Sequence, residues 1–173
     1  TTLPLLNPRV VVRDVVHSTN PRKVWAAVAP ARTLLTNKAP YLLFPRGDLP
    51  VQAYVLGILG SSVCDWFGHL RINLNLNFFI LNSIPIPRYQ ADERQVRLGE
   101  LAASLAVRSE ADKGYGAWHE LRTPVDPSSA IAELDALASL IFGVPDDLLP
   151  TIWNSPSRPP LAEVQTWRKH WTA

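Results

Sequence analysis

The stretch Asn75–Pro87, NLNFFILNSIPIP, is the starting point for interpreting the whole chain. It is apolar, has an asparagine-rich entry and ends in a doubled Ile-Pro. Proline fixes its own φ angle and has no backbone donor, and the residue before it is pushed toward an extended conformation. Residues 84–87 are therefore predicted to form a stiff, extended exit that ends one packed unit and directs the chain to the next. The apolar side chains of the stretch are expected in the core: Leu76, Phe78, Phe79, Leu81, Ile84 and Ile86.

The residues before this stretch favour short strands and one helix. Segments rich in β-branched residues predict strands at 10–12, 15–16, 24–28 and 41–44, with turns at 37–40 and 46–48. Residues 51–69 have apolar side chains at the helical spacing i, i+3, i+4, i+7, and Pro50 suits a first turn. Gly57 and Gly60 would allow close packing of this helix against a neighbour.

The residues after this stretch favour helices, and the change falls near residues 87–91. The apolar periodicity predicts helices at 92–112, 126–142, 145–153 and 161–171, with a stop at 114–116. Asp126-Pro127 suits an N-cap followed by a first-turn proline. The chain is therefore predicted to be α+β, with a small mixed-sheet domain at residues 1–90 followed by a helical region at residues 91–173.

Composition limits the class of protein. The 173 residues are enough for one domain, or one domain with an appendage. Cys64 is the only cysteine, so no disulfide can form within the chain, and a reducing cytoplasm is the expected compartment. No apolar run reaches the roughly 18 residues that a membrane-spanning helix needs, so no membrane partner is expected. The lack of methionine suggests a part of a longer protein.

The charge is unevenly distributed, although the net charge is only +2. Residues 1–90 hold nine Lys or Arg against three Asp, whereas residues 91–173 hold eight Lys or Arg against twelve Asp or Glu. This asymmetry points to a polyanionic partner for the first half. Arginine suits phosphates and guanine edges, and asparagine suits adenine. Codon bias is an alternative explanation for the excess of arginine over lysine, but it does not explain the asymmetry. If the first half reads DNA, its cationic and amide side chains should converge on one groove.

Motifs for catalysis and metal binding are absent from the sequence. There is no glycine-rich nucleotide loop, no zinc-ligand pair and no nucleophile elbow. Cys64 and His69 are five residues apart and would lie on different faces of a helix. The four histidines are dispersed. The chain itself is therefore expected to be non-catalytic, with no metal and no cofactor of its own.

Three segments resemble one family. Residues 13–22, RDVVHSTNPR, resemble the R-D-(I/V)-x-x-S-T-N-x-R segment of C-terminal specificity regions in type II restriction–modification methyltransferases. Residues 75–87 resemble their L-N-x-x-x-L-x-x-(I/L)-P-(I/L)-P segment, and residues 132–144, AELDALASLIFGV, resemble the helix that follows in many such proteins. Bacteriophage-exclusion methyltransferases are similar. The three matches span most of the chain, in the family's order.

The resemblance implies a target-recognition region of an N6-adenine DNA methyltransferase. The family's catalytic asparagine-proline-proline-aromatic tetrapeptide and its S-adenosylmethionine-binding glycine motif are missing, as is any evident nuclease motif. S-adenosylmethionine would therefore be bound by another part of the parent protein, where a catalytic domain flips and methylates adenine. Residues 92–112 resemble the spacer helix of type I specificity subunits, and are expected to pack on the methyltransferase body or on a neighbouring recognition unit.

The hypothesis is sequence-specific recognition of double-stranded DNA within a restriction–modification or phage-defence methyltransferase. The residues expected to contact DNA are Thr19, Asn20, Arg22, Lys23, Lys38, Arg71, Asn73 and Asn75. The expected partners are double-stranded DNA and the methyltransferase domain of the same parent chain. The alternative is a structural module that clamps that domain, or binds a partner protein, without touching DNA.

Overall fold

The computed structural model describes residues 3–107 and 113–173, and its fold is α+β, which confirms the predicted class. Two strands, β1 (Arg9–Val12) and β2 (Ala26–Ala29), pair antiparallel with Arg9 opposite Ala29 and Val12 opposite Ala26. The sheet of the described residues is thus antiparallel, not mixed. The predicted strand at 41–44 contributes a single bridge, Val11 to Tyr41, and the one at 15–16 a single bridge, Val15 to Asn75.

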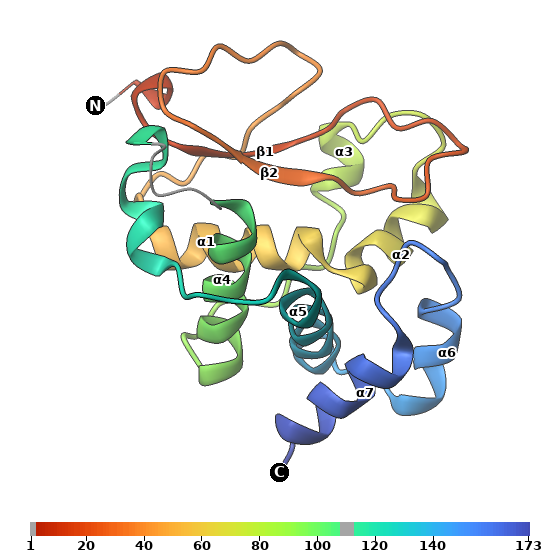
Figure 1. The fold of residues 1–173 in the computed structure, drawn as a ribbon. Coiled ribbons are helices and arrows are strands. Elements are labelled where there is room, and N and C mark those ends of the chain that lie inside the picture. The colour runs from red at the N-terminus through yellow and green to blue at the C-terminus, as the bar shows by residue number, and fades with distance from the viewer. Residues whose placement is uncertain (1–2, 108–112) are drawn as a thin grey trace.

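The helices α1 (Leu49–Gly60), α4 (Glu93–Ala106), α5 (Pro127–Ile141), α6 (Leu149–Ile152) and α7 (Leu161–His170) lie on one side of this sheet, whereas α3 (Phe78–Leu81) is drawn level with its strands (Figure 1). Below the sheet, α1 runs along it, α4 and α5 cross beneath α1, and α6 and α7 lie furthest from the sheet (Figure 1). The helical elements are η1 (Pro4–Leu6), α1 (Leu49–Gly60), α2 (Ser62–Arg71), α3 (Phe78–Leu81), α4 (Glu93–Ala106), η2 (Lys113–Leu121), α5 (Pro127–Ile141), η3 (Asp146–Leu148), α6 (Leu149–Ile152) and α7 (Leu161–His170).

The helix predicted over residues 51–69 is two helices. Ser61 has an extended backbone, with φ −76° and ψ 155°, and separates α1 from α2. Its side-chain oxygen accepts a hydrogen bond from the Cys64 backbone N–H, so serine acts as the N-cap of α2. The apolar spacing continues across the break, which is why periodicity alone did not reveal it. Pro50 does lie in the first turn of α1 as predicted, and Asp126 does cap α5 through the Ser129 N–H.

The hydrophobic core crosses the predicted boundary at residues 90–91. One cluster contains side chains from β1, α1, α4 and α5, among them Val10, Ile58, Leu98 and Leu137. A Cβ atom added to Gly57 would overlap the Leu98 side chain and stand 3.1 Å from the Leu98 carbonyl oxygen, so α1 and α4 are in direct contact. Within the predicted helix 92–112, α4 packs on α1 and α5 of this chain, and its packing on a methyltransferase body or a neighbouring recognition unit stays a prediction. Residues 108–112 lie outside the described residues.

The stretch Asn75–Pro87 is only partly buried. Leu76, Leu81 and Ile84 enter the core as predicted, but Phe78 and Phe79 are 58% and 84% exposed, so their assignment to the core is wrong. The reason is a single helical turn: the Asn77 side chain accepts from the Ile80 N–H and caps α3, which turns Leu81 inward and the two phenylalanines outward. Residues 84–87 have no regular secondary structure, and the Tyr54 hydroxyl donates to the Pro87 carbonyl oxygen.

Candidate nucleic-acid interface

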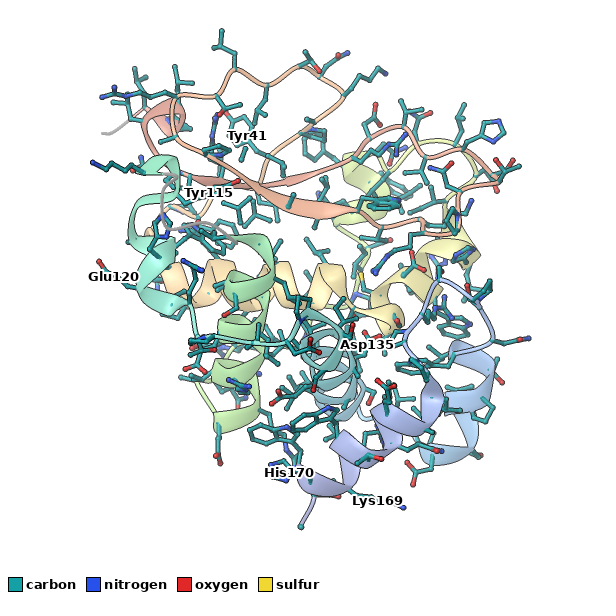
Figure 2. The ribbon with its side chains drawn as sticks, in the orientation of Figure 1. Tyr41, Tyr115, Glu120, Asp135, Lys169 and His170 are labelled. Carbon is teal, nitrogen blue, oxygen red and sulfur yellow. The ribbon has the colours of Figure 1, made fainter. Side chains whose placement is uncertain are left out.

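Three loops that are far apart in the sequence meet beyond one end of the β1–β2 sheet. The Val16 N–H donates to the Leu74 carbonyl oxygen at 2.7 Å, and the Leu76 N–H donates to the Asp14 carbonyl oxygen at 2.7 Å. The Asp14 N–H in turn donates to the Lys38 carbonyl oxygen at 3.0 Å. Residues 13–20, 36–39 and 71–79 therefore form one surface, which we call the loop end. It lies opposite Lys169 and His170, which Figure 2 labels on α7.

The Asp14 carboxylate connects two of the other segments of the loop end. Its carboxylate accepts from the Asn75 amide at 3.1 Å and pairs with the Lys38 ammonium at 3.2 Å. The hydrogen bond from Asn75, followed by the bond from Lys38, holds the pKa of Asp14 below its usual range. The carboxylate thus fixes an amide and a cation that come from different loops. The Lys38 side chain is still 60% exposed, so it can also meet an anion from solvent.

The most exposed polar candidates lie around this carboxylate. Thr19 is at the tip of its loop, where its hydroxyl is 2.9 Å from Nδ1 of His17, and the Asn20 N–H closes the turn on the His17 carbonyl. Arg71 and Asn73 are exposed, and the Arg71 guanidinium lies 5.1 Å from the centroid of the Phe67 ring. Six of the eight predicted contact residues are thereby brought together: Thr19, Asn20, Lys38, Arg71, Asn73 and Asn75.

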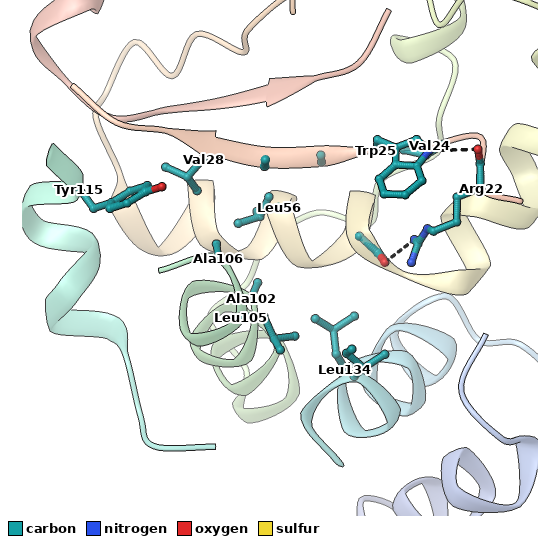
Figure 3. Close-up of a pocket in the computed structure, with 14 residues that line it drawn as sticks. Arg22, Val24, Trp25, Val28, Leu56, Ala102, Leu105, Ala106, Tyr115 and Leu134 are labelled. Carbon is teal, nitrogen blue, oxygen red and sulfur yellow. Dashed lines mark hydrogen bonds between the residues drawn. The ribbon is translucent and has the colours of Figure 1, made fainter. Parts of the chain in front are cut away.

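The other two predicted contact residues support the loop from inside. Lys23 is only 4% exposed, and its ammonium donates to the carbonyl oxygens of His17 and Ser18 at 2.9 and 2.7 Å. Arg22 donates to the Gly60 carbonyl oxygen at 2.6 Å, and its own carbonyl accepts from the Trp25 indole (Figure 3). Because these groups are already used within the protein, we leave Arg22 and Lys23 out of the candidate interface.

A buried carboxylate on α2 anchors the loop end to the helices. Asp65 is 1% exposed, and one of its oxygens accepts from the backbone N–H groups of Lys23 and Val24 at 2.6 and 3.1 Å. Its other oxygen accepts from the Arg158 guanidinium at 3.3 Å. One side chain therefore ties the end of the 13–22 loop to both α2 and the segment before α7. This role could not be predicted from the amino-acid pattern, because Lys23, Val24 and Arg158 are all distant from Asp65 in the chain.

The apolar part of the surface was not predicted. Leu70, Leu74, Phe78 and Phe79 are between 53% and 84% exposed and alternate with Arg71, Asn73, Asn75 and Asn77. An Asn cap directly before an apolar run is a signal for a new helical turn, and it could have shown which phenylalanines turn outward. The loop end therefore combines cations, amides and exposed aromatic rings.

The basic residues of the first half do not all face this surface, which corrects the expectation of a single groove. Arg9, Arg32 and Arg46 line a separate cavity nearer the N-terminus. A further cavity of about 410 Å³ lies between β2 and the helices α1, α4 and α5 (Figure 3). It is mainly apolar, with Val28, Leu56, Leu105 and Leu134 in its wall and Arg22 at one end.

Cys64, the nucleophile weighed from the sequence, is not placed for catalysis. Cys64 is buried, and burial raises the pKa of its thiol to about 12, which is the reverse of what a nucleophilic cysteine needs. No group of three or more His, Cys, Asp or Glu side chains within residues 3–107 and 113–173 is arranged to hold a metal ion. No helix in those ranges is both long and apolar enough to cross a membrane.

Comparison of the chain with protein-family models, with curated proteins and with solved structures gives no significant match. The loop end is therefore interpreted from its own residues.

Proposed function

We propose that this chain recognises specific sequences in double-stranded DNA and acts as the non-catalytic reading part of a restriction–modification or phage-defence adenine methyltransferase. In this proposal, S-adenosylmethionine and the transfer of the methyl group belong to a methyltransferase domain of the parent protein, in the cytoplasm. The observation that carries the proposal is the loop end, where backbone hydrogen bonds join three segments that are distant in the sequence and that carry six cationic, amide and hydroxyl side chains.

The chemistry of that surface suits a duplex. Arg71 and Lys38 can neutralise phosphates, while Asn73, Asn20 and Thr19 offer hydrogen-bonding groups to base edges. Side chains that read bases must be held in place, and here the bridges between residues 14–16 and 74–76 fix the spacing of two loops. Thr19 and Asn20 lie in residues 13–22, and Asn75 lies in residues 75–87. These are two of the three segments that resemble the methyltransferase family.

Fluorescence anisotropy with labelled duplexes of random sequence tests the proposal. Affinity should fall on the order of 10- to 100-fold between about 50 and about 200 mM salt, because bound phosphates release counterions. Selection from a randomised duplex library should then enrich one sequence. Binding that does not change with salt, or a library that stays random after selection, would contradict DNA reading.

A protein clamp is the second candidate, and one observation favours it. The Val12 N–H donates to the Pro40 carbonyl oxygen and therefore points away from β2. Val12 and Ala26 are thus a pair without hydrogen bonds between them, so the backbone N–H and C=O of Ala26 point toward the open edge of the sheet. That edge borders the 410 Å³ cavity, and Trp25 beside it is 42% exposed. An unpaired strand edge next to an apolar cavity can accept a strand from another polypeptide.

Trp25→Ala separates the two candidates. A clamp predicts that this substitution weakens co-elution with an adenine methyltransferase domain in gel filtration, and that the chain binds no duplex. DNA reading predicts that Trp25→Ala leaves duplex affinity within about twofold, while Arg71→Ala lowers it.

A further inference from the structure

A second large cavity lies at the opposite end of the β1–β2 sheet from the loop end. Its volume is about 1170 Å³, and its walls come from η1, the start of β1, the turn after β2, residues 42–49 and η2. Four cationic side chains line it: Arg9, Arg32, Arg46 and Lys113. The described lining residues include no Asp or Glu. Four like charges around one hollow repel each other, so this arrangement suits a bound anion.

Arg9 gives independent evidence for a missing partner. It is 7% exposed, yet it forms no ion pair with any described residue. Its guanidinium donates one hydrogen bond, to the Thr33 carbonyl oxygen at 2.6 Å, and lies 5.2 Å from the centroid of the Tyr41 ring, which Figure 2 labels. Its Nε–H has no hydrogen-bond partner. A buried cation without a counter-charge is costly, and an anion in the cavity would relieve that cost.

Backbone contacts position Arg32 and the segment beside Lys113 at the cavity. Arg32 has a left-handed backbone, with φ 62°, and its N–H donates to the Leu5 carbonyl oxygen at 2.7 Å. The neighbouring Ala31 N–H donates to the Gly114 carbonyl oxygen at 2.7 Å, which fixes the loop beside Lys113. Arg46, Arg32 and Lys113 are exposed, and their side chains have no hydrogen bond or ion pair with a described residue.

We infer that this cavity binds a phosphate-bearing anion. Guanidinium forks match phosphate oxygens in pairs, and several cations together match a group with more than one negative charge better than a single carboxylate. The amides of Asn7 and Gln52 also line the cavity and supply neutral donors. This inference goes beyond the proposed reading surface, because it uses different residues at the other end of the sheet. The phosphate can come from a nucleic-acid backbone or from a free phosphate compound.

Isothermal titration with pyrophosphate, at constant ionic strength, tests the inference. Three proteins are compared: the wild-type chain, the double variant Arg46→Gln/Lys113→Gln and the control Lys169→Gln. Arg46 and Lys113 are exposed, so the double variant should keep its thermal unfolding midpoint, and Lys169 is an exposed cation on α7, far from the cavity. Pyrophosphate should bind the wild type and Lys169→Gln alike, and the double variant at least about tenfold more weakly. Arg9→Lys should also weaken binding, since lysine keeps the charge but loses the fork.

Competition with duplex DNA then identifies the source of the phosphate. Displacement of labelled duplex by pyrophosphate, together with weaker duplex binding by the double variant, assigns the cavity to the nucleic-acid backbone. Pyrophosphate binding without displacement assigns it to a free phosphate compound. Equal binding of pyrophosphate by wild type and double variant would overturn the inference, and so would tighter binding of a hexaglutamate peptide than of pyrophosphate. DNA binding by the loop end is measured separately with Arg71→Ala. A negative result there does not decide whether the cavity binds phosphate.

Discussion

The helical body and the loop end are built by different means. In the body, formed by α1, α4 and α5, leucine and alanine side chains are almost fully buried, and α1 and α4 touch at Gly57 and Leu98. It also contains a salt bridge in which Arg97 donates two hydrogen bonds of 2.9 Å to Glu133. The loop end has little regular structure and is held by a few backbone hydrogen bonds and by Asp14 and Asp65. The contrast shows how a rigid frame can carry exposed, variable side chains.

Asp65→Ala is expected to have the largest effect, because Asp65 joins the two regions. Its removal leaves the Lys23 and Val24 N–H groups and the Arg158 guanidinium without their buried acceptor. Breaking a buried pair in this way costs about 3–5 kcal/mol of unfolding free energy. Urea unfolding measures the loss. Asp146→Ala is the matched control: the Asp146 side chain is 86% exposed and pairs with Arg168, so its loss should cost less than about 1 kcal/mol. Equal losses would contradict the anchoring role of Asp65.

Asp135 makes the stability of the helical body depend on pH. Its buried carboxyl accepts from the backbone N–H and the hydroxyl of Ser62 on α2. Burial, the largest cause, raises the pKa of Asp135 from 3.8 to about 6. The folded state therefore binds more protons than the unfolded state between pH 4 and pH 6, approximately. The resulting stabilisation is complete below the unfolded pKa and is lost as the pH rises through about 6.

This contribution is on the order of 3 kcal/mol. Unfolding free energies of the wild type and of Asp135→Asn should be compared across this pH range. The unfolding free energy of the wild type minus that of Asp135→Asn should fall as the pH rises, because asparagine does not titrate. A difference that is flat, or that rises with pH, would show that the folded carboxyl titrates normally or at a lowered pKa.

Gly57→Ala tests how closely the body is packed. The added Cβ would overlap the Leu98 side chain, and overpacking of this kind costs about 1–3 kcal/mol. Gly60→Ala is the matched control in the same helix, since a Cβ there meets nothing within 4 Å and alanine is the better helix former. Thermal unfolding should separate the two variants. Both should bind duplex DNA like the wild type at temperatures where they are folded, because neither changes the loop end.

Arg71→Ala tests the loop end without disturbing the body. Arg71 is exposed and its guanidinium lies against the Phe67 ring, so the unfolding midpoint should hardly change. Duplex affinity should fall about 5- to 20-fold, corresponding to about 1–2 kcal/mol. The dependence of affinity on salt then tells the type of contact: a slope reduced by about 1 indicates a phosphate, and an unchanged slope with relaxed sequence preference indicates a base. Lys169→Ala, on α7, should change neither quantity.

Phe79→Ala should have the smallest effect of the series. Phe79 is 84% exposed, and an aromatic ring beside cations and amides can stack on or wedge between bases. Duplex affinity should fall about three- to fivefold in anisotropy measurements, with no loss of stability. Leu34→Ala is the control, because Leu34 is 85% exposed and lies outside residues 13–20, 36–39 and 71–79. If the two variants bind DNA equally, Phe79 has no part in the interface.

The sequence was sufficient for the class of fold and for most helices, because apolar periodicity and capping residues are local signals. It was insufficient where a single hydrogen bond changes the local structure: the Ser61 cap splits one predicted helix, and the Asn77 cap turns Phe78 and Phe79 outward. Six of the eight residues predicted to contact DNA lie on the loop end, because exposed turns collect polar side chains, and their contact with DNA stays a prediction. The internal hydrogen bonds of Arg22 and Lys23 could not be predicted. The Arg22 partner, the Gly60 carbonyl, is distant in the sequence, and the Lys23 partners, the carbonyls of His17 and Ser18, come within reach only because the loop folds back.

The anchoring by Asp65 has a consequence for how such a protein can change. The loop between Val16 and Lys23 is fixed at one end by the Leu74 carbonyl and at the other by the Asp65 carboxylate, and both anchors bind main-chain N–H groups. Main-chain groups are the same in every residue except proline, so the interior of the loop can be rewritten without losing its attachment. Doubling the length of such a loop costs only about 0.6 kcal/mol. Under the proposed function, a new target preference could arise by substituting residues of the loop between Val16 and Lys23, with no change in the helices beneath it.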